Sequence, residues 1–122
     1  MSARIKVTKF DSYALIKLEG RLLPTGEESI DEKFRESFDN LISEGINKII
    51  LDFRDVDFIA SSSIGVILYG YNKLSDVNGK LVIWRPKNYI AQSLKLVKID
   101  KIVSIIENEN DALKELGINL FS

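Results

Sequence analysis

The stretch KIILDFRDVDFIASSSIGVILYGY, residues 48–71, contains the pattern that decides the fold. Residues 48–53 form a continuous apolar run, which is typical of a strand covered on both faces in a parallel sheet. After a predicted loop at 54–58, apolar side chains recur at helical spacing until an Asn-Gly pair at 78–79. The Ile, Val and Tyr residues of this second segment also favour a strand, but the segment from 61 to 76 is too long for a strand. We therefore predict a central strand followed by a helix from 61 to 76.

The residues before this stretch predict a hairpin and a helix. Residues 4–10 and 13–20 alternate apolar and polar side chains, as the two strands of a hairpin do. The helix that follows ends at Gly45. Two capping boxes compete for its start, so its first residue stays open. They are Thr25 with Glu28 and Ser29 with Glu32, and the apolar stripe of the helix consists of Ile30, Phe34, Phe38, Leu41 and Ile42.

The second half of the chain continues to alternate strands and helices. Residues 80–84 predict a buried strand that Pro86 breaks, and residues 88–99 predict a helix with Ile90, Leu94 and Val97 on one face. A last strand is expected within 102–107. A short helix is expected at 110–117, with Asn110 or Asp111 near its cap and Gly117 after its end. The predicted order is ββαβαβαβα, an α/β fold with a mostly parallel sheet and an antiparallel N-terminal hairpin.

The bulk composition limits what the protein does. A chain of 122 residues with 45% hydrophobic and 29% charged residues fits one domain, residues 1–122. A net charge of −1 argues against nucleic-acid or membrane-surface partners. Because histidine and cysteine are absent, Ser-His-Asp and Cys-His catalysis and the usual zinc sites are excluded. We expect no enzyme, catalytic residue, metal or cofactor. The start MSARIKV lacks a signal core, so we expect a cytoplasmic protein.

Three consecutive serines, Ser61 to Ser63, follow the central strand. In open α/β sheets, functional groups gather beyond the carboxyl ends of the strands. A helix start there offers unpaired backbone N–H groups and a partial positive charge, which together favour a phosphate. In the simpler interpretation, one serine is an N-cap worth about 1 kcal/mol, and the others are small residues that pack closely with Gly65.

The segment LDFRDVDFIASSSIGVIL, residues 51–68, resembles the hallmark of STAS-domain proteins of the anti-sigma factor antagonist family. That hallmark is a strand and then an Asp-Ser-Ser/Ala-Gly-Leu-Gly turn that opens a helix. The resemblance extends to EGRL at 19–22 and to residues 79–105, and thus to essentially the whole chain. It implies a STAS-like fold.

The same resemblance implies a bacterial phospho-switch. A partner anti-sigma factor with GHKL-type serine kinase activity phosphorylates the serine after the hallmark aspartate, and a phosphatase reverses the reaction. That serine corresponds to Ser61 here, with Ser62 and Ser63 as alternatives. The surface implied for partner binding consists of Ala60, Ser61, Ser62, Ser63, Ile64 and Val66.

The chain departs from the family pattern at three positions. Ala60 stands where the hallmark has aspartate, Leu23 stands where the family usually has an acid, and Ser63 replaces the hallmark glycine. The loss of both carboxylates indicates either altered kinase recognition or a STAS-like scaffold that binds a partner without being phosphorylated.

Asp52, Asp55 and Asp57 suggest a third function, a Mg²⁺, phosphate or nucleotide site of the aspartyl-phosphate receiver type. A receiver also needs an acidic pair after its first parallel strand, and EGRLLP at 19–24 has a single glutamate. We therefore favour turn-forming, solvated aspartates on a loop.

The remaining candidates are a basic segment, two aromatic residues and two glycines. We interpret the basic segment as a solvated face rather than a docking site for an acidic partner. Trp84 is expected in the core, and Tyr89 is a candidate partner anchor. Gly65 and Gly70 predict close backbone contacts on the second helix. The basic residues are Lys87, Lys95, Lys98 and Lys101.

Overall fold

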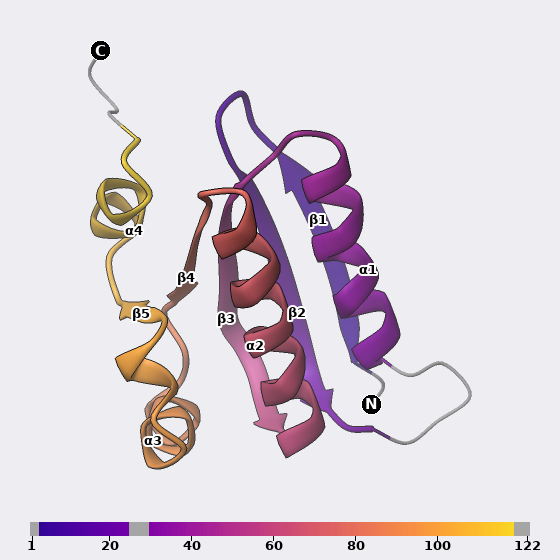
Figure 1. Ribbon diagram of the computed structural model, residues 1–122. Coiled ribbons are helices and arrows are strands. Elements are labelled where there is room, and N and C mark those ends of the chain that lie inside the picture. Colours follow the sequence, from indigo (N-terminus) through magenta and orange to yellow (C-terminus); the bar gives the residue numbers. More distant parts are fainter. Residues whose placement is uncertain (1–2, 25–29, 119–122) are drawn as a thin grey trace.

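The computed structural model describes residues 3–24 and 30–118. Within these residues the order of elements is the predicted one, with an additional 3₁₀ turn, η1, before the last strand (Figure 1). The elements are β1 (Arg4–Lys9), β2 (Ala14–Leu22), α1 (Ile30–Ser43), β3 (Lys48–Ile59), α2 (Ser61–Asp76), β4 (Lys80–Trp84), α3 (Asn88–Leu96), η1 (Ile99–Lys101), β5 (Ser104–Ile106) and α4 (Glu109–Glu115).

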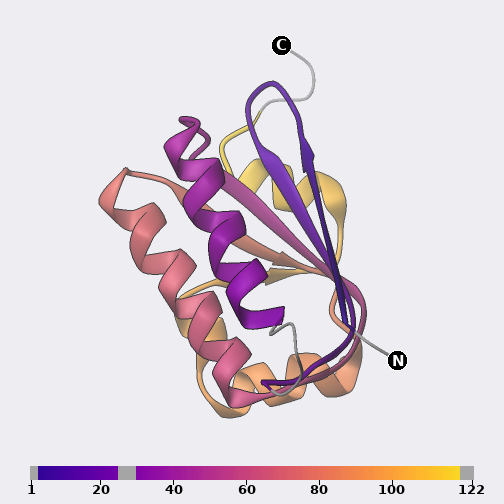
Figure 2. The same ribbon diagram turned by 90° about the vertical axis from the view of Figure 1, so that its right-hand side faces the viewer.

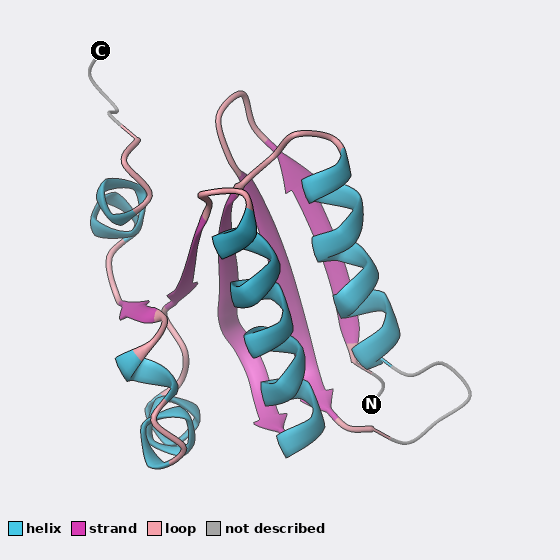
Figure 3. Ribbon diagram, in the orientation of Figure 1, coloured by secondary structure: helices cyan, strands magenta, loops and turns pink. Residues whose placement is uncertain are grey.

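The described strands form one sheet in the order β1-β2-β3-β4-β5 (Figure 3). β1 pairs antiparallel with β2, and the other neighbours pair in parallel. The hairpin is closed by a 2.8 Å hydrogen bond from the amide of Phe10 to the carbonyl of Tyr13. The predicted mostly parallel sheet with an antiparallel N-terminal hairpin is therefore confirmed, and β3 is its central strand.

Helices cover both faces of the sheet. α1 and α2 lie on one face and α4 on the other, as the view in Figure 2 shows. Ile49 and Leu51 of β3 point into the larger core beneath α1 and α2. Between them, Ile50 points into a smaller core that also contains Trp84 and Leu113. The continuous apolar run at the start of β3 thus reflects burial on two faces.

β3 is longer than predicted, because residues 54–58 are strand and not loop. β4 ends opposite Asp52, so the second half of β3 pairs with β2 alone. This pairing contains register shifts, and Gly20 has a φ of +85°, a conformation that glycine adopts without steric cost. Val56 and Ile59 are buried in the larger core, which stabilises the extension.

The ends of several elements differ from the predictions. Gly45, with a φ of +86°, follows α1 as expected, whereas the capping-box residues Thr25, Glu28 and Ser29 lie outside the described residues. The last strand spans only 104–106. The N-cap of α4 is Asn108, not Asn110 or Asp111. Its side chain accepts hydrogen bonds from both of those amides and so caps the helix two to three residues earlier.

The third helix is also shorter than predicted. α3 ends at Leu96, because Lys98 adopts a left-handed φ of +65° and the chain continues into η1. Val97 is therefore exposed instead of continuing the apolar stripe of Ile90 and Leu94, which are buried as expected. Ile99, in the η1 turn, is instead buried in the larger core together with Ile90 and Leu94.

α1 and α2 approach closely where Phe38 lies over Gly70. A β-carbon added to Gly70 would overlap the ring of Phe38, whereas one added to Gly65 would meet open space. The predicted close contact is thus confirmed at Gly70 and wrong at Gly65, which lies on the exposed face of α2.

Gly70→Ala is expected to lower the free energy of unfolding by about 1–3 kcal/mol, because the added methyl group overpacks the contact with Phe38. Gly65→Ala is the matched control on the same helix. It is expected to leave stability unchanged or to raise it by up to about 1 kcal/mol through helix propensity. Urea denaturation of both variants measures the difference, and equal effects at the two sites would contradict the packing described.

Candidate functional site

The serine turn, residues 60–63, consists of Ala60, which connects β3 to α2, and the first three residues of α2 (Figure 1). The amide of Ala60 donates a 2.9 Å hydrogen bond to the carbonyl of Leu22, which ties the turn to the end of β2. Ala60 is the N-cap of α2, and it makes no side-chain capping hydrogen bond. Its carbonyl accepts the amides of Ser63 and Ile64 at 3.0 and 3.2 Å. The interpretation of a serine as the N-cap is therefore wrong.

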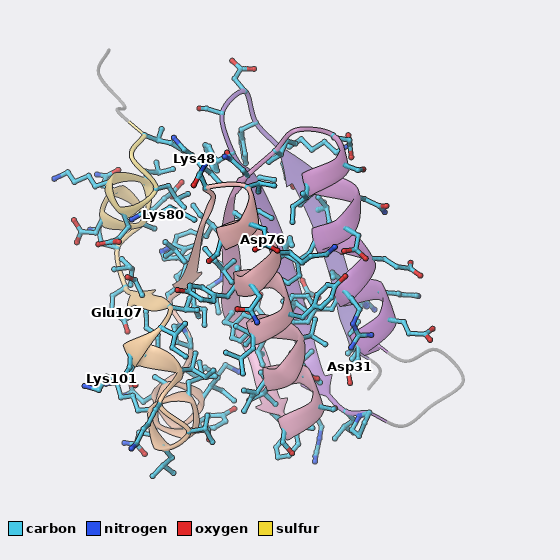
Figure 4. The ribbon with its side chains drawn as sticks, in the orientation of Figure 1. Asp31, Lys48, Asp76, Lys80, Lys101 and Glu107 are labelled. Carbon is cyan, nitrogen blue, oxygen red and sulfur yellow. The ribbon has the colours of Figure 1, made fainter. Side chains whose placement is uncertain are left out.

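The three serines have different environments. Ser61 and Ser62 are exposed, whereas the side chain of Ser63 is fully buried. The Ser63 hydroxyl donates a 2.5 Å hydrogen bond to Oδ1 of Asp31, which is only 8% exposed. Asp31 lies in the first turn of α1, at the lower end of that helix in Figure 4. Sequence reasoning missed Asp31, because an acid in the first turn of a helix is ordinarily explained by the helix dipole.

The predicted partner surface is smaller than expected. Ser63 and Val66 are buried, because positions 63, 66, 67, 70 and 74 form the face of α2 that packs on the sheet and α1. Ala60 and Ile64 are half-buried and remain accessible beside the two exposed serines. The accessible set is therefore Ala60, Ser61, Ser62 and Ile64.

The exposed serines lie where a helix offers donors to an anion. Within the described part of the chain, the amides of Ser61 and Ser62 have no hydrogen-bond partner. They are the first two amides of a 16-residue helix, whose dipole places partial positive charge at this end. A phosphate on either serine is thus compatible with the fold.

Two exposed aromatic rings lie on β3 and α3. Phe58, near the end of β3, is 41% exposed, and the guanidinium of Arg21 lies 5.3 Å from the centre of its ring. Tyr89, in the first turn of α3, is 52% exposed. Trp84 is buried and donates its indole N–H to the carbonyl of Glu107 at 3.2 Å, so the prediction that it lies in the core is confirmed.

A family model for the STAS domain matches residues 6–112 of this sequence. The chain belongs to the STAS domain family. Proteins of this family that act as anti-sigma factor antagonists are binding and regulatory proteins, not enzymes, which agrees with the absence of histidine and cysteine. A Thermotoga neapolitana protein classed with these antagonists is 33% identical over 107 residues, which cover 85% of this chain and 95% of that protein.

Solved structures of STAS domains share the fold. A Thermotoga maritima protein of the same class superimposes with a TM-score of 0.81 at 25% identity, over 93% of this chain and 94% of that one. SpoIIAA in its unphosphorylated form gives a TM-score of 0.78 at 19% identity, over 95% and 99% of the two chains. Its phosphorylated form gives 0.70, over 91% and 97%. The predicted STAS-like α/β fold is thus confirmed.

The three aspartates of this STAS domain do not form one site. They lie on β3 and not on a loop, and each has its own partner. Asp52 is buried and accepts the amide of Arg54 at 3.1 Å, Asp55 pairs with Lys17 at 3.2 Å, and Asp57 pairs with Lys87. Residues 3–24 and 30–118 contain no group of three His, Cys, Asp or Glu side chains that could hold a metal ion.

The basic segment of the STAS domain is divided between two environments. Lys87 precedes α3 and contacts Asp57, whereas Lys95, Lys98 and Lys101 are exposed around the end of α3 and η1. These three lysines form no ion pair with any described residue. The solvated-face interpretation therefore applies to them and not to Lys87. No helix in the described ranges has both the length and the apolar composition to cross a membrane.

The ion pairs of β3 perturb two lysines. The hydrogen bond between Lys87 and Asp57 raises the pKa of Lys87. The hydrogen bond between Lys17 and Asp55 likewise raises the pKa of Lys17. A lysine whose pKa is raised by folding stabilises the protein fully below its unfolded-state pKa of about 10.4, and this contribution is lost as the pH rises through the folded-state pKa.

Asp57→Asn is expected to lower the pKa of Lys87 toward its ordinary value, because a neutral amide attracts the ammonium group less. Its destabilising effect should be present at neutral pH and disappear above the titration of the lysine. NMR titration of the lysine side chains measures the pKa directly. Asp55→Asn is the control, since it should act mainly on Lys17. An unchanged Lys87 pKa in Asp57→Asn would show that the pair does not persist in solution.

Proposed function

We propose that this STAS domain is a bacterial, cytoplasmic anti-sigma factor antagonist that binds an anti-sigma factor with GHKL-type serine kinase activity. The binding surface is the accessible set Ala60, Ser61, Ser62 and Ile64, with Phe58 and Tyr89 as aromatic anchors. Phosphorylation of Ser61 weakens this binding, and a phosphatase restores it. The observation that carries the proposal is the exposure of Ser61 at the start of a long helix that follows the central strand.

The electrostatics of the serine turn support such a switch. A phosphate adds a charge of about −1.5 to −2, which the unpaired amides and the dipole at the start of α2 accommodate without unfolding. On a partner's surface, the same charge brings repulsion and a desolvation cost. The likeness to SpoIIAA in both its unphosphorylated and phosphorylated forms supports the view that this fold tolerates the modification.

Aromatic side chains give the proposed surface its apolar contacts. Tyrosine is enriched among the residues that contribute most to protein–protein binding, and aromatic residues are enriched in interface centres. Phe58 lies beside the guanidinium of Arg21 and is still 41% exposed, so its ring is available to a partner. A rigid side chain loses little entropy on binding.

A second candidate function is a scaffold that assembles with partners without a phosphorylation cycle. It is favoured by the absence of a carboxylate in the serine turn, where the N-cap is Ala60, and by the half-buried, apolar Leu23 at the end of β2. A kinase that recognises an acid at either position would find none. Binding in this case does not depend on ATP.

Incubation with a candidate anti-sigma factor of the GHKL-type serine kinase class, ATP and Mg²⁺, followed by intact-mass measurement, tests the proposal. We expect a gain of one phosphate in the wild-type chain and in Ser62→Ala, and none in Ser61→Ala. Transfer to Ser62 instead of Ser61 would move the acceptor by one residue and contradict the assignment. Unchanged mass with retained binding would support the scaffold.

Binding of Mg²⁺ and nucleotides by the isolated chain is a separate expectation. Because the three aspartates of β3 are engaged in different contacts, calorimetric titration with Mg²⁺ and ATP should give no heat of binding. A saturable signal that Asp55→Asn or Asp57→Asn removes would restore the phosphate-handling function.

A further inference from the structure

Among the hydrogen bonds of the described residues, two between side chains connect α1 to α2. The first joins Ser63 to Asp31 at 2.5 Å in the first turns of both helices. The second joins the hydroxyl of Tyr69 to Oδ1 of Asp39 at 2.6 Å, farther along both helices. Both helices begin at the end of the molecule to which β3 points, as Figures 1 and 2 show. The two bonds therefore fasten the same pair of helices at different distances from the serine turn.

The Asp31–Ser63 hydrogen bond is buried, unlike its counterpart. Asp31 is 8% exposed and Ser63 is 0% exposed, whereas the hydrogen bond of Tyr69 is partly open to solvent. A buried carboxylate is costly without a donor, and a bond from a hydroxyl to an ionised group is short and strong. Asp31 also lies at the positive ends of two helix dipoles, those of α1 and α2. The hydroxyl of Ser63 thus supplies the donor that this buried side chain needs.

The serine turn lacks the restraint that usually fixes a helix start. Ala60 provides no side-chain cap. Within the described residues, the first turn of α2 is held by the two backbone hydrogen bonds to the Ala60 carbonyl and by the hydrogen bond from the Ser63 hydroxyl to Asp31. A serine inside a helix commonly donates its hydroxyl to the carbonyl four residues earlier in the same helix, as Ser37 and Ser93 do here. Ser63 instead reaches a different helix. This contact couples the position of the turn to α1.

We propose that Asp31 is a positioning residue that, through Ser63, holds the first turn of α2 in the orientation that presents Ser61 and Ser62. Asp31 provides from α1 a carboxylate that the turn itself lacks at Ala60. The effect on partner binding rests on the proposed function, whereas the effect on the turn does not. Ser63 is accordingly a structural hydroxyl and not an acceptor of phosphate.

Amide hydrogen exchange of Ser63 and Ile64 tests the bridge without any partner. In Asp31→Ala these amides should exchange about tenfold faster, or more, relative to the core amides of β3. Asp31→Asn keeps an acceptor oxygen and should retain most of the protection. Ser63→Ala removes the donor of the same hydrogen bond. The double variant Asp31→Ala/Ser63→Ala should therefore exchange these amides little faster than either single variant.

Asp39→Ala is the matched control, because it breaks the other bond between α1 and α2. It should lower overall stability and leave the relative exchange of the serine turn unchanged. If Asp31→Ala accelerates Ser63 and Ile64 no more than Asp39→Ala does, the proposal is overturned. If Asp31→Ala does not fold, the same comparison is made with Ser63→Ala.

The affinity for the kinase of the proposed function gives a second readout. Asp31→Ala should weaken binding by about tenfold, and Asp31→Asn and Asp39→Ala by much less. Equal affinity of Asp31→Ala and the wild-type chain would overturn the link to binding. If no kinase binds the wild-type chain, the proposed function fails, and the exchange experiment still decides whether Asp31 positions the turn.

Discussion

Burial of β3 between two apolar layers is the constraint on which the rest of the structure depends. Its residues alternate between the larger core beneath α1 and α2 and the smaller core beneath α4. Because both faces are covered, a shift in register by one residue would move the β3 side chains of the larger core into the smaller core, and the reverse. The carboxyl end of β3 is thereby fixed, and with it the start of α2, which follows after a single residue.

The close contact between Phe38 and Gly70 fixes how α1 and α2 pack against each other on the sheet. It brings α1 against α2 at a distance that a larger residue than glycine would prevent. The first turns of the two helices then lie near enough for Ser63 to reach Asp31. The helix pair, the buried bond and the exposed serines are therefore consequences of one packing arrangement, and the site depends on residues far from it in the sequence.

Charge is distributed so that the serine turn has no carboxylate of its own at the surface. The aspartates that precede it on β3 are taken up by backbone or lysine partners, and Asp31 is buried. Within the described residues, what remains accessible is a small surface with two hydroxyls and two unpaired amides, and the exposed ring of Phe58 precedes it by two residues. Such a surface suits a protein partner, and its free amides suit added negative charge. Whether this surface serves a phosphorylated switch or a scaffold depends on whether a kinase needs an acid at position 60 or 23 to recognise it.

The sequence by itself determined the order of the elements, because apolar periodicity distinguishes strands from helices locally. It also determined that α2 begins at the serines, where the pattern changes from a continuous run to helical spacing. Glycines after α1 and α4 ended those helices as expected, since a left-handed residue is needed there. The family resemblance rested on this same stretch of sequence.

Only the tertiary structure decided which serine is accessible, how far β3 extends and what Asp31 contacts. Three identical residues in a row give no local signal for which one faces the core. The face of α2 that packs on α1 made Ser63 and Val66 buried and left Ser61 and Ser62 exposed. Residues 54–58 are polar enough to indicate a loop, and pairing with β2 made them strand. These outcomes depend on neighbours distant in sequence, which local patterns do not contain.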